Sequence, residues 1–354
     1  MKPRILIALL FLCVTALLLW GSSCTQVTTP PVNGEPDTTS HNFVFETFVL
    51  GDGNSSSLYD VAIVNDTLAY AVGEIYLKDS TGQLDPNRYN ATVWNGGTWN
   101  VIRIPYFYQG QPFHNPIQTI NAISNDDIWF AGNGIIHWNG QQYIPVEIPS
   151  QVWGAYRINS IWGNANEFYI VGDGGSMARY AGGGWQKIES STTMDIRDIH
   201  GYVDPFNGKR VLLGVASSSS GVRILSLSQS TVRDTLAWQV NDQLSSIWVS
   251  NQFNVYAGGP GIWKHDGLVW QQVDSLPVVF YNKVRGTGEN NIFVAGRDVL
   301  AHYNGASWHV FSGIPADFRF RSVAVSKNVV IAVGFTVSGA IAGNAAIVVG
   351  KRIH

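Results

Sequence analysis

An apolar strand that ends in glycine recurs along most of this sequence, and this repeat limits the possible fold more than any other feature. The motif is clearest at residues 129–132, 169–172 and 255–258. After a first interval of 59 residues, its glycines follow one another at intervals of 38 to 44 residues. The seven glycines are Gly73, Gly132, Gly172, Gly214, Gly258, Gly296 and Gly334. A period of about 40 residues is typical of β-propellers, whose repeats are four-stranded blades. The sequence therefore predicts an all-β fold, a seven-bladed β-propeller of four-stranded blades.

A second signature marks the turn between the third and fourth strands of most repeats. Residues 94–99 read Trp-Asn-Gly-Gly-Thr-Trp, and residues 303–308 read Tyr-Asn-Gly-Ala-Ser-Trp. Asn-Gly supplies the positive φ angles of a tight hairpin, and the flanking aromatic residues can pair across it. The fourth repeat lacks this turn, and the first contains a long insertion. Six or eight blades are therefore the alternatives to seven.

The seventh repeat has no fourth strand of its own. We expect its strands near 320–325, 329–333 and 345–349, after which the chain ends at His354. The apolar segment 43–49, which precedes the first repeat, fits the missing position. We therefore expect this N-terminal strand to complete the last blade and to close the ring, which leaves fewer open sheet edges.

The N-terminus has the order of an export signal. Lys2 and Arg4 precede an apolar run over 5–20, and small residues lead to Cys24. The uncharged run is short for a membrane span, so a retained transmembrane helix is the weaker alternative. The ending Gly-Ser-Ser-Cys resembles a bacterial lipobox, although glycine replaces the usual leucine three residues before the cysteine. The resemblance implies cleavage after residue 23 and lipidation of Cys24, which would then have no second cysteine to pair with.

The segment 24–40 is rich in Thr, Pro and Gly and nearly free of apolar residues, which predicts a flexible tether. The expected organisation is a lipoprotein signal peptide over 1–23, a tether over 24–40 and the propeller over 41–354. Thr25 is not the Asp that retains enterobacterial lipoproteins in the inner membrane. We therefore expect an exported monomer in the bacterial cell envelope, anchored to the outer membrane through the lipid on Cys24.

Charge excludes one class of partner. Without residues 1–23 the chain has 20 Lys and Arg against 25 Asp and Glu, a net charge of −5, and its basic residues form no stripe. Nucleic acid is therefore not expected as a partner. Only 13% of the residues are charged and 45% are hydrophobic, as suits many short buried strands.

Two stretches resemble a known group of bacterial propellers. Residues 127–132 read Asp-Ile-Trp-Phe-Ala-Gly and residues 303–308 read Tyr-Asn-Gly-Ala-Ser-Trp, which match the group's repeats Asp-Ile-Trp-x-x-Gly and Tyr-Asn-Gly-x-x-Trp. The group includes lipoproteins and relatives of photosystem II assembly-factor and BNR-repeat propellers. The resemblance covers roughly residues 55–335, and its motifs are structural. No intact sialidase Asp-box is present, so the resemblance implies no glycosidase activity.

No catalytic or metal-binding motif stands out. The sequence has no Gly-x-Ser-x-Gly, no His-Glu-x-x-His and no cysteine pair for zinc. The glycine-rich stretches 132–134 and 172–175 each link two strands, without the helix that a phosphate loop needs. We therefore expect no metal and no cofactor, name no catalytic residue, and favour a protein without enzymatic activity.

Two histidines occupy equivalent positions in different repeats. Where His137 and His302 stand, other repeats carry Val93, Arg179 and Lys264. A position that accepts all of these residue types predicts an exposed side chain rather than a metal ligand.

Long connections of the first repeat place aromatic residues on one face. We name the strands of a blade A to D in chain order; B–C loops and D–A connections share a face. The first repeat has a B–C insertion over 78–90 and a D–A connection over 105–118. Aromatic residues on such loops suit sugar stacking or a protein hot spot. Alternatively, they fold back and cap the first two blades. The candidate ligand-binding residues are Tyr106, Phe107, Tyr108, Phe113, His114, Trp153 and Tyr156.

Polar residues near the start of the A strands form a second candidate site. These strands begin on the same face, nearest the central channel, where propellers often place ligands. The ring could hold a small polar ligand or an ion, and the alternative is a channel mouth filled with water. Neither of the two aspartates has an identifiable partner that would make it an acid or a base. The candidates are Asp60, Asn121, Asn159, Arg197, Asp198, Asn282, Lys283 and Arg321.

The leading hypothesis is a non-enzymatic binding or scaffold propeller that holds a protein or a glycan on the face of the B–C and D–A loops. The alternative is a glycan-active hydrolase or lyase with its site at the channel mouth. Two facing carboxylates in a pocket would favour the enzyme, whereas an aromatic, carboxylate-poor patch would favour binding. A third possibility is a purely structural envelope component, which would show neither feature.

Overall fold

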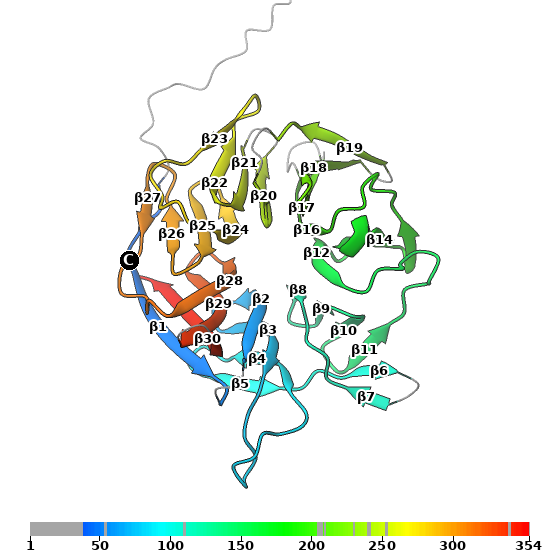
Figure 1. Cartoon of the computed structure of the whole chain (residues 1–354), viewed down its shortest axis with the longest axis vertical. Coiled ribbons are helices and arrows are strands. Elements are labelled where there is room, and N and C mark those ends of the chain that lie inside the picture. Colours follow the sequence, from blue (N-terminus) through cyan, green and yellow to red (C-terminus); the bar gives the residue numbers. More distant parts are fainter. Residues whose placement is uncertain are drawn as a thin grey trace, which may run out of the picture. The chain divides into compact units, whose positions relative to one another are not determined.

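Seven antiparallel sheets of four strands each surround a common centre, so the predicted seven-bladed β-propeller is confirmed (Figure 1). The structure is a computed structural model. It describes residues 38–52, 55–108, 111–203, 208, 210–228, 231–238, 242–251, 254–338 and 341–353. The expected signal peptide, Cys24 and the expected tether up to residue 37 lie outside the described residues.

Each blade is one sheet, and its A strand lies nearest the centre in Figure 1. The first three blades are β2 (Ser57–Asn65), β3 (Leu68–Ile75), β4 (Tyr89–Trp94) and β5 (Trp99–Ile102); β8 (Thr119–Ser124), β9 (Asp127–Ala131), β10 (Ile135–Trp138) and β11 (Tyr143–Val146); and β12 (Ile158–Asn164), β13 (Glu167–Gly172), β14 (Met177–Ala181) and β15 (Gly184–Lys187). The next three are β16 (Ile196–Val203), β17 (Arg210–Ser218), β18 (Gly221–Ser228) and β19 (Thr231–Leu236); β20 (Ser246–Asn251), β21 (Asn254–Gly259), β22 (Gly261–His265) and β23 (Trp270–Gln272); and β24 (Tyr281–Gly288), β25 (Asn291–Gly296), β26 (Leu300–Tyr303) and β27 (Trp308–Val310). The seventh blade is β28 (Phe318–Val325), β29 (Val329–Ser338), β30 (Ile341–Arg352) and β1 (Phe43–Leu50).

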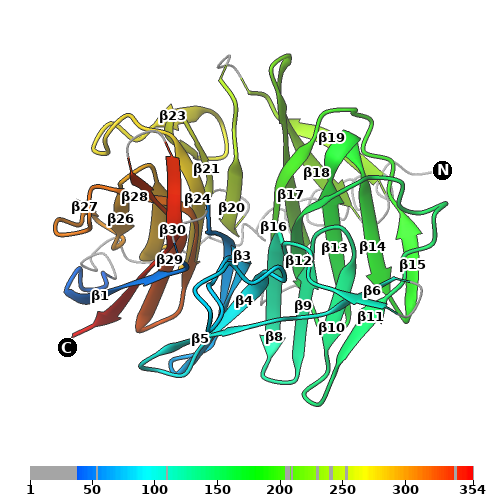
Figure 2. The same ribbon diagram turned by 60° about the horizontal axis from the view of Figure 1, so that its bottom comes forward.

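Two small elements lie outside the blades. One turn of 3-10 helix, η1 (Asp173–Gly175), links β13 and β14. A short hairpin, β6 (Tyr106–Tyr108) and β7 (Gln111–Phe113), forms in the connection between the first two blades. Figures 1 and 2 both place this hairpin beside β11 of the second blade.

The N-terminal strand closes the ring, as the missing strand of the seventh repeat predicted. β1 pairs antiparallel with β30 along its whole length. The residues just before it reach the sixth blade, where the N–H of Thr39 donates to the carbonyl of Asn304 at 3.0 Å. The Nδ1 atoms of His41 and His302 are 2.9 Å apart. The N-terminal segment therefore joins the last two blades without a covalent bond.

His302 is fully buried, so the prediction of an exposed position is wrong for this residue. Its ring stacks on Phe293, with ring centroids 4.5 Å apart, and is covered by His41 and Phe43. The equivalent His137 is half-buried. The repeat pattern could not predict this difference, because the cover comes from a segment that is distant in sequence and reaches the sixth blade.

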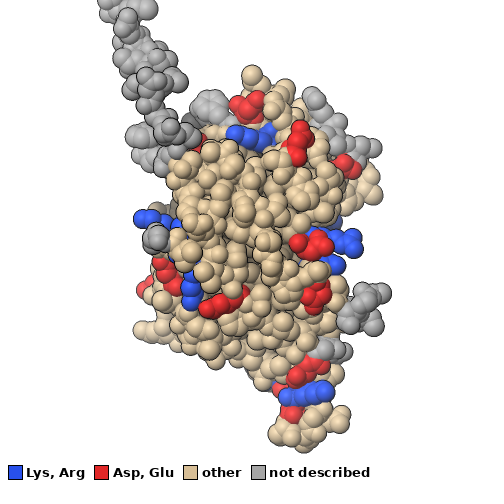
Figure 3. Space-filling model, turned by 90° about the vertical axis from the view of Figure 1, so that its left-hand side faces the viewer, with Lys and Arg blue, Asp and Glu red and all other residues tan. Residues whose placement is uncertain are grey.

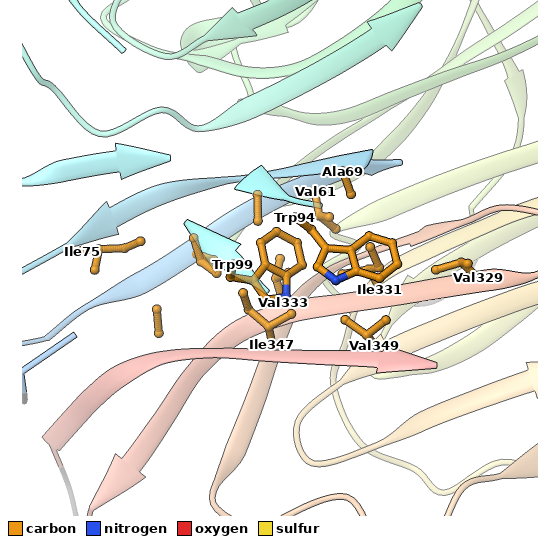
Figure 4. Close-up of a cluster of buried hydrophobic side chains, with 13 residues drawn as sticks. Val61, Ala69, Ile75, Trp94, Trp99, Val329, Ile331, Val333, Ile347 and Val349 are labelled. Atoms are coloured by element: carbon orange, nitrogen blue, oxygen red, sulfur yellow. The ribbon is translucent and has the colours of Figure 1, made fainter. Parts of the chain in front are cut away.

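Each pair of neighbouring blades encloses a cluster of buried apolar side chains. Successive residues of a strand point to opposite faces, so Leu212 packs toward the third blade and Leu213 toward the fifth. Between the first and seventh blades, the indoles of Trp94 and Trp99 stack with centroids 6.3 Å apart (Figure 4). Burial on both faces of every blade explains the low charged fraction. On the side shown in Figure 3, charged side chains stand as isolated groups on a largely uncharged surface.

The repeated glycine has a steric cause. A Cβ atom on Gly334 would lie 1.9 Å from the carbonyl oxygen of Arg319, because the bulged A strand of the same blade passes close to it. In the fourth blade, the corresponding position is Ala216. Gly214 lies two residues earlier, and β17 continues past it to Ser218. The prediction that this strand ends at Gly214 is therefore wrong, and β3 and β29 likewise continue past their repeat glycines, to Ile75 and Ser338.

Candidate binding site at the channel mouth

Five β-bulges place side chains at one end of the central channel. Each interrupts the pairing between an A strand and its B strand, as between Ile158 and Ser160. A bulge adds one unpaired residue and re-aims its side chain. The added residues are Tyr59, Asn159, Arg197, Asn282 and Arg321. All five line one cavity of ≈ 210 Å³, which we call the channel mouth.

The channel mouth is lined mainly by polar and basic side chains. The lining residues stand at or near the starts of A strands, so the mouth opens on the face of the D–A connections. Four of its ten lining residues are cations, and Asp60 is the single carboxylate among them. The other lining residues are Gln118, Arg157, Ser245 and Lys283.

Polar side chains, one from each blade, stand at matching positions of the A strands at the mouth, and their hydrogen bonds link the A strands of several neighbouring blades. In the first blade, Asp60 accepts hydrogen bonds from the hydroxyls of Thr119 at 2.8 Å and Ser322 at 2.6 Å. Its carboxylate also accepts from the backbone N–H of Ile120 at 3.1 Å. Asp60 therefore links the first blade to both of its neighbours. We call the whole set the polar ring: Asp60, Thr119, Ser160, Asp198, Ser246, Lys283 and Ser322.

Asp198 links the fourth blade to both of its neighbours in the same way, and it also forms ion pairs with two cations. It accepts from the hydroxyls of Ser160 at 2.9 Å and Ser246 at 2.7 Å. Its Oδ1 lies 3.1 Å from Nζ of Lys283 and 2.7 Å from Nη2 of Arg285. Burial alone would raise the pKa of the Asp198 carboxyl, but the charges of Arg285 and Lys283 outweigh it and hold that pKa far below its usual range. The carboxylate is therefore ionised and compensates both cations.

The structure brings together six of the eight polar residues predicted for the channel. Those that line the mouth are Asp60, Asn159, Arg197, Asn282, Lys283 and Arg321. Asp198 is fully buried in the polar ring, and Asn121 lines a second cavity farther along the A strands.

Sequence reasoning missed four residues of the mouth. Tyr59, Gln118 and Ser245 directly precede a member of the polar ring, so an alignment of the repeats on that ring would have found them. Arg157 comes from the connection before β12 and has no such signal.

One cation of the mouth lacks an ion pair. Arg157, Arg197 and Lys283 each lie within 3.4 Å of a carboxylate oxygen. Arg321 has no ion pair with any residue that the structure describes, and its guanidinium stands 5.2 Å from the ring centre of Tyr59. Its Nε donates to the hydroxyl of Ser57 at 3.0 Å, so among the described residues Arg321 is the one cation of the mouth that is not directly paired with a carboxylate.

Two of the aromatic candidates fold back onto the blades. Tyr106 is buried in the apolar cluster between the first and second blades. The ring of Trp153 packs over the B–C turn of the third blade, 2.9 Å from where a Cβ atom on Gly172 would stand. Both side chains therefore contribute to packing, and Tyr106 is not accessible for stacking on a ligand.

The other aromatic candidates differ in exposure. Tyr156 is 80% exposed, whereas Phe113 and His114 are half-buried. Burial lowers the pKa of the His114 ring. The side chains of Phe107 and Tyr108 lie outside the described residues.

A larger hollow of ≈ 800 Å³ opens on the same face, between the third and fourth blades. Glu189 is the one carboxylate among its described lining residues, and its Oε1 lies 2.6 Å from Nζ of Lys187. Ser191 has a φ of 57°, in the left-handed region that non-glycine residues rarely adopt. The hollow is rich in hydroxyl groups, from Ser176, Ser190, Ser191, Thr192, Thr193 and Ser220.

The described part of the chain shows neither a cluster of metal ligands nor a helix long enough to cross a membrane. It contains no cluster of three or more His, Cys, Asp or Glu side chains that could hold a metal ion. Within the same residues, no helix has the length and apolar character needed to cross a bilayer.

Known proteins resemble this chain in fold. No protein-family model matches the sequence, and no curated protein matches it. A solved structure titled "YCF48 bound to D1 peptide" is similar, with a TM-score of 0.62 and 14% sequence identity over 90% of this chain and 100% of that chain. At this identity, the likeness supports the β-propeller architecture alone.

Proposed function

We propose that this protein is a non-enzymatic binding module whose channel mouth holds a carboxylate-bearing segment of a partner protein. The observation that carries the proposal is a lining with four cations and one carboxylate, in which Arg321 has no ion pair with a described residue. Four blades direct cations to the mouth: Arg157 from the third, Arg197 from the fourth, Lys283 from the sixth and Arg321 from the seventh. The one carboxylate of the lining, Asp60, already accepts three hydrogen bonds.

Arg321 is the main anchor in this proposal. Its guanidinium has no carboxylate partner among the described residues, so an incoming carboxylate need not displace one. Arginine binds carboxylates through two parallel hydrogen bonds, which are stronger than those between neutral groups. The similar solved structure, whose title names a bound peptide, supports the choice of a peptide ligand over a glycan.

The alternative of a glycan-active enzyme receives less support from this geometry. Such enzymes place two carboxylates on either side of the bond that breaks. Among the described residues that line the mouth, Asp60 is the single carboxylate. Asp198 is fully buried between two cations, where it is held ionised and away from a substrate.

The proposal can be tested with an array of immobilised peptides that ranges from acidic to basic sequences. The affinity of the strongest binder is then measured by fluorescence anisotropy. Arg321→Ala should weaken binding about tenfold or more, since a hydrogen bond to a charged group contributes about 1.5–3 kcal/mol. Lys327→Ala is the matched control, because Lys327 is exposed between β28 and β29, at the A–B turns on the opposite face. Binding that is indifferent to peptide charge, or equal in both variants, would contradict the proposal.

We also propose that the protein is exported and lipid-anchored through Cys24. The support is the order of charged, apolar and small residues before Cys24, together with the absence of a second cysteine after it. Cys24→Ser should move the protein from the membrane fraction to the soluble fraction of the cell envelope. If the variant remains in the membrane fraction, the anchor is not Cys24.

A further inference from the structure

The central channel contains a second cavity, of ≈ 260 Å³, beside the polar ring. We call it the inner chamber. Its lining comes from the middle and later residues of the A strands, so it lies toward the A–B turns, whereas the mouth lies toward the D–A connections. Asp60 lines both cavities. The volume lies just below the range of roughly 300–1,000 Å³ that is typical of ligand sites, and suits a single small ring.

Asn121 lines the chamber and carries an unpartnered hydrogen-bond donor. Its Nδ2 is buried and has no hydrogen-bond partner within the described part of the chain. Leaving such a group unsatisfied is costly, and buried polar groups nearly always have a partner. An acceptor supplied by a bound molecule would meet this requirement.

His200 supplies a second donor with a fixed tautomer. Its Nδ1 accepts from the backbone N–H of Val249 at 3.2 Å, so the proton of the neutral ring is on Nε2. Burial, and then the charge of Arg285, lowers the pKa of His200 to about 3, so the ring is neutral at physiological pH. No residue that the structure describes accepts from Nε2, and His200 lines the chamber.

The chamber also has an acceptor and a flat apolar wall. Asp60 uses three of the about four acceptor positions of a carboxylate. Trp162 lines the chamber, and its indole packs against Gly201, where a Cβ atom would come within 2.4 Å of the ring. The charged groups of the lining are Asp60 and Arg285, and Arg285 is already paired with Asp198. The lining therefore offers no uncompensated cation to an anion.

We infer that the inner chamber binds a neutral, ring-shaped polyol of monosaccharide size. Hydroxyl groups both donate and accept, so one ligand can accept from Asn121 and His200 and donate to Asp60. The C–H face of a sugar ring packs on an indole, as Trp162 offers. This site is separate from the channel mouth, and the inference does not depend on the proposed peptide ligand.

The test titrates the protein with glucose, galactose, mannose and N-acetylglucosamine, monitored by saturation-transfer NMR and calorimetry. At least one sugar should bind saturably. Asn121→Leu should weaken that binding at least tenfold, while the midpoint of thermal unfolding stays the same or rises, because the amide that it removes has no partner. Asn121→Ala removes the same donor with a smaller side chain and should give the same loss, which covers the case in which leucine does not fit.

Arg321→Ala is the matched control, because it alters the mouth and leaves the chamber lining intact. It should bind the sugar as the unmodified protein does, whatever it does to peptide binding. The inference is overturned if none of the four sugars binds, if the folded Asn121 variants bind as tightly as the unmodified protein, or if Arg321→Ala abolishes sugar binding.

Discussion

The polar ring allows a matched comparison of two buried carboxylates. Asp60 and Asp198 occupy the same position in their blades, and each accepts from two neighbouring hydroxyls and one backbone N–H. They differ in one respect, because Asp198 also contacts Lys283 and Arg285. Replacing each by Asn keeps the shape and removes the charge. The difference between the two variants therefore isolates the ion pairs.

We expect Asp198→Asn to be the more destabilising change. Removing one partner of a buried ion pair costs about 3–5 kcal/mol, because the opposite charge remains buried without compensation. Asp60→Asn leaves no cation behind, and disturbing its hydrogen bonds should cost about 1–3 kcal/mol. The free energy of unfolding should therefore fall by about 2 kcal/mol more in Asp198→Asn, with part of the cost relieved by adding Arg285→Met.

Urea unfolding followed by tryptophan fluorescence measures both variants, and pH gives an independent check. The pKa of Asp198 is far lower in the folded protein than the value of about 3.9 in an unfolded chain, so its stabilisation is complete above about pH 4 and is lost as the pH falls further. The difference between the unmodified protein and Asp198→Asn should therefore shrink below pH 4. Equal destabilisation by the two Asn variants at pH 7, or a difference that does not change with pH, would refute the role given to the cations.

Three further changes test the closure, the repeat glycine and the buried histidine. Phe43→Ala should lower the free energy of unfolding by about 2 kcal/mol. The loss is smaller than for a fully buried Phe, because Phe43 is half-buried against the sixth blade. An unchanged urea midpoint would argue against the closing role of β1. Gly334→Ala should lower the thermal midpoint clearly more than Gly288→Ala, whose added Cβ would make ordinary contacts, and equal midpoints would contradict the steric argument. Burial lowers the pKa of His302 to about 3, whereas a His in the unfolded chain binds a proton near pH 6.5, so the unmodified protein should lose stability as the pH falls from 7 to 5. His302→Gln should make this loss smaller. Parallel plots of stability against pH for the two proteins would contradict this.

The sequence could predict what depends on local periodicity. The seven blades follow from the spacing of strands and glycines, and the closing strand follows from the missing strand of the last repeat. The register within a blade could not be predicted, because it depends on bulges that become visible only when two strands are paired. For this reason the sequence pattern does not show that β17 continues past Gly214, or that Tyr59 lines the mouth.

The residues of the site could be predicted only in part, because their position along the channel depends on how the strands pair. In the sequence the polar A-strand residues form one set, but the polar ring divides the channel into two cavities. Asn159 precedes the ring position of its strand and lines the mouth, whereas Asn121 follows the ring position and lines the inner chamber. His302 illustrates the other limit, because its burial comes from a segment about 260 residues earlier in the chain.

The repeat and the site are consequences of one local arrangement. In the seventh blade, Gly334 lets the A strand pass within van der Waals distance, and the bulge in that strand directs Arg321 to the mouth. The polar ring links neighbouring blades through hydrogen bonds such as the one from the Ser322 hydroxyl to Asp60, and the bulge residues take no part in these bonds. A bulge residue can therefore be exchanged without breaking the ring. Binding specificity at the mouth should follow from the five bulge residues, while stability follows from the polar ring and the apolar clusters between blades.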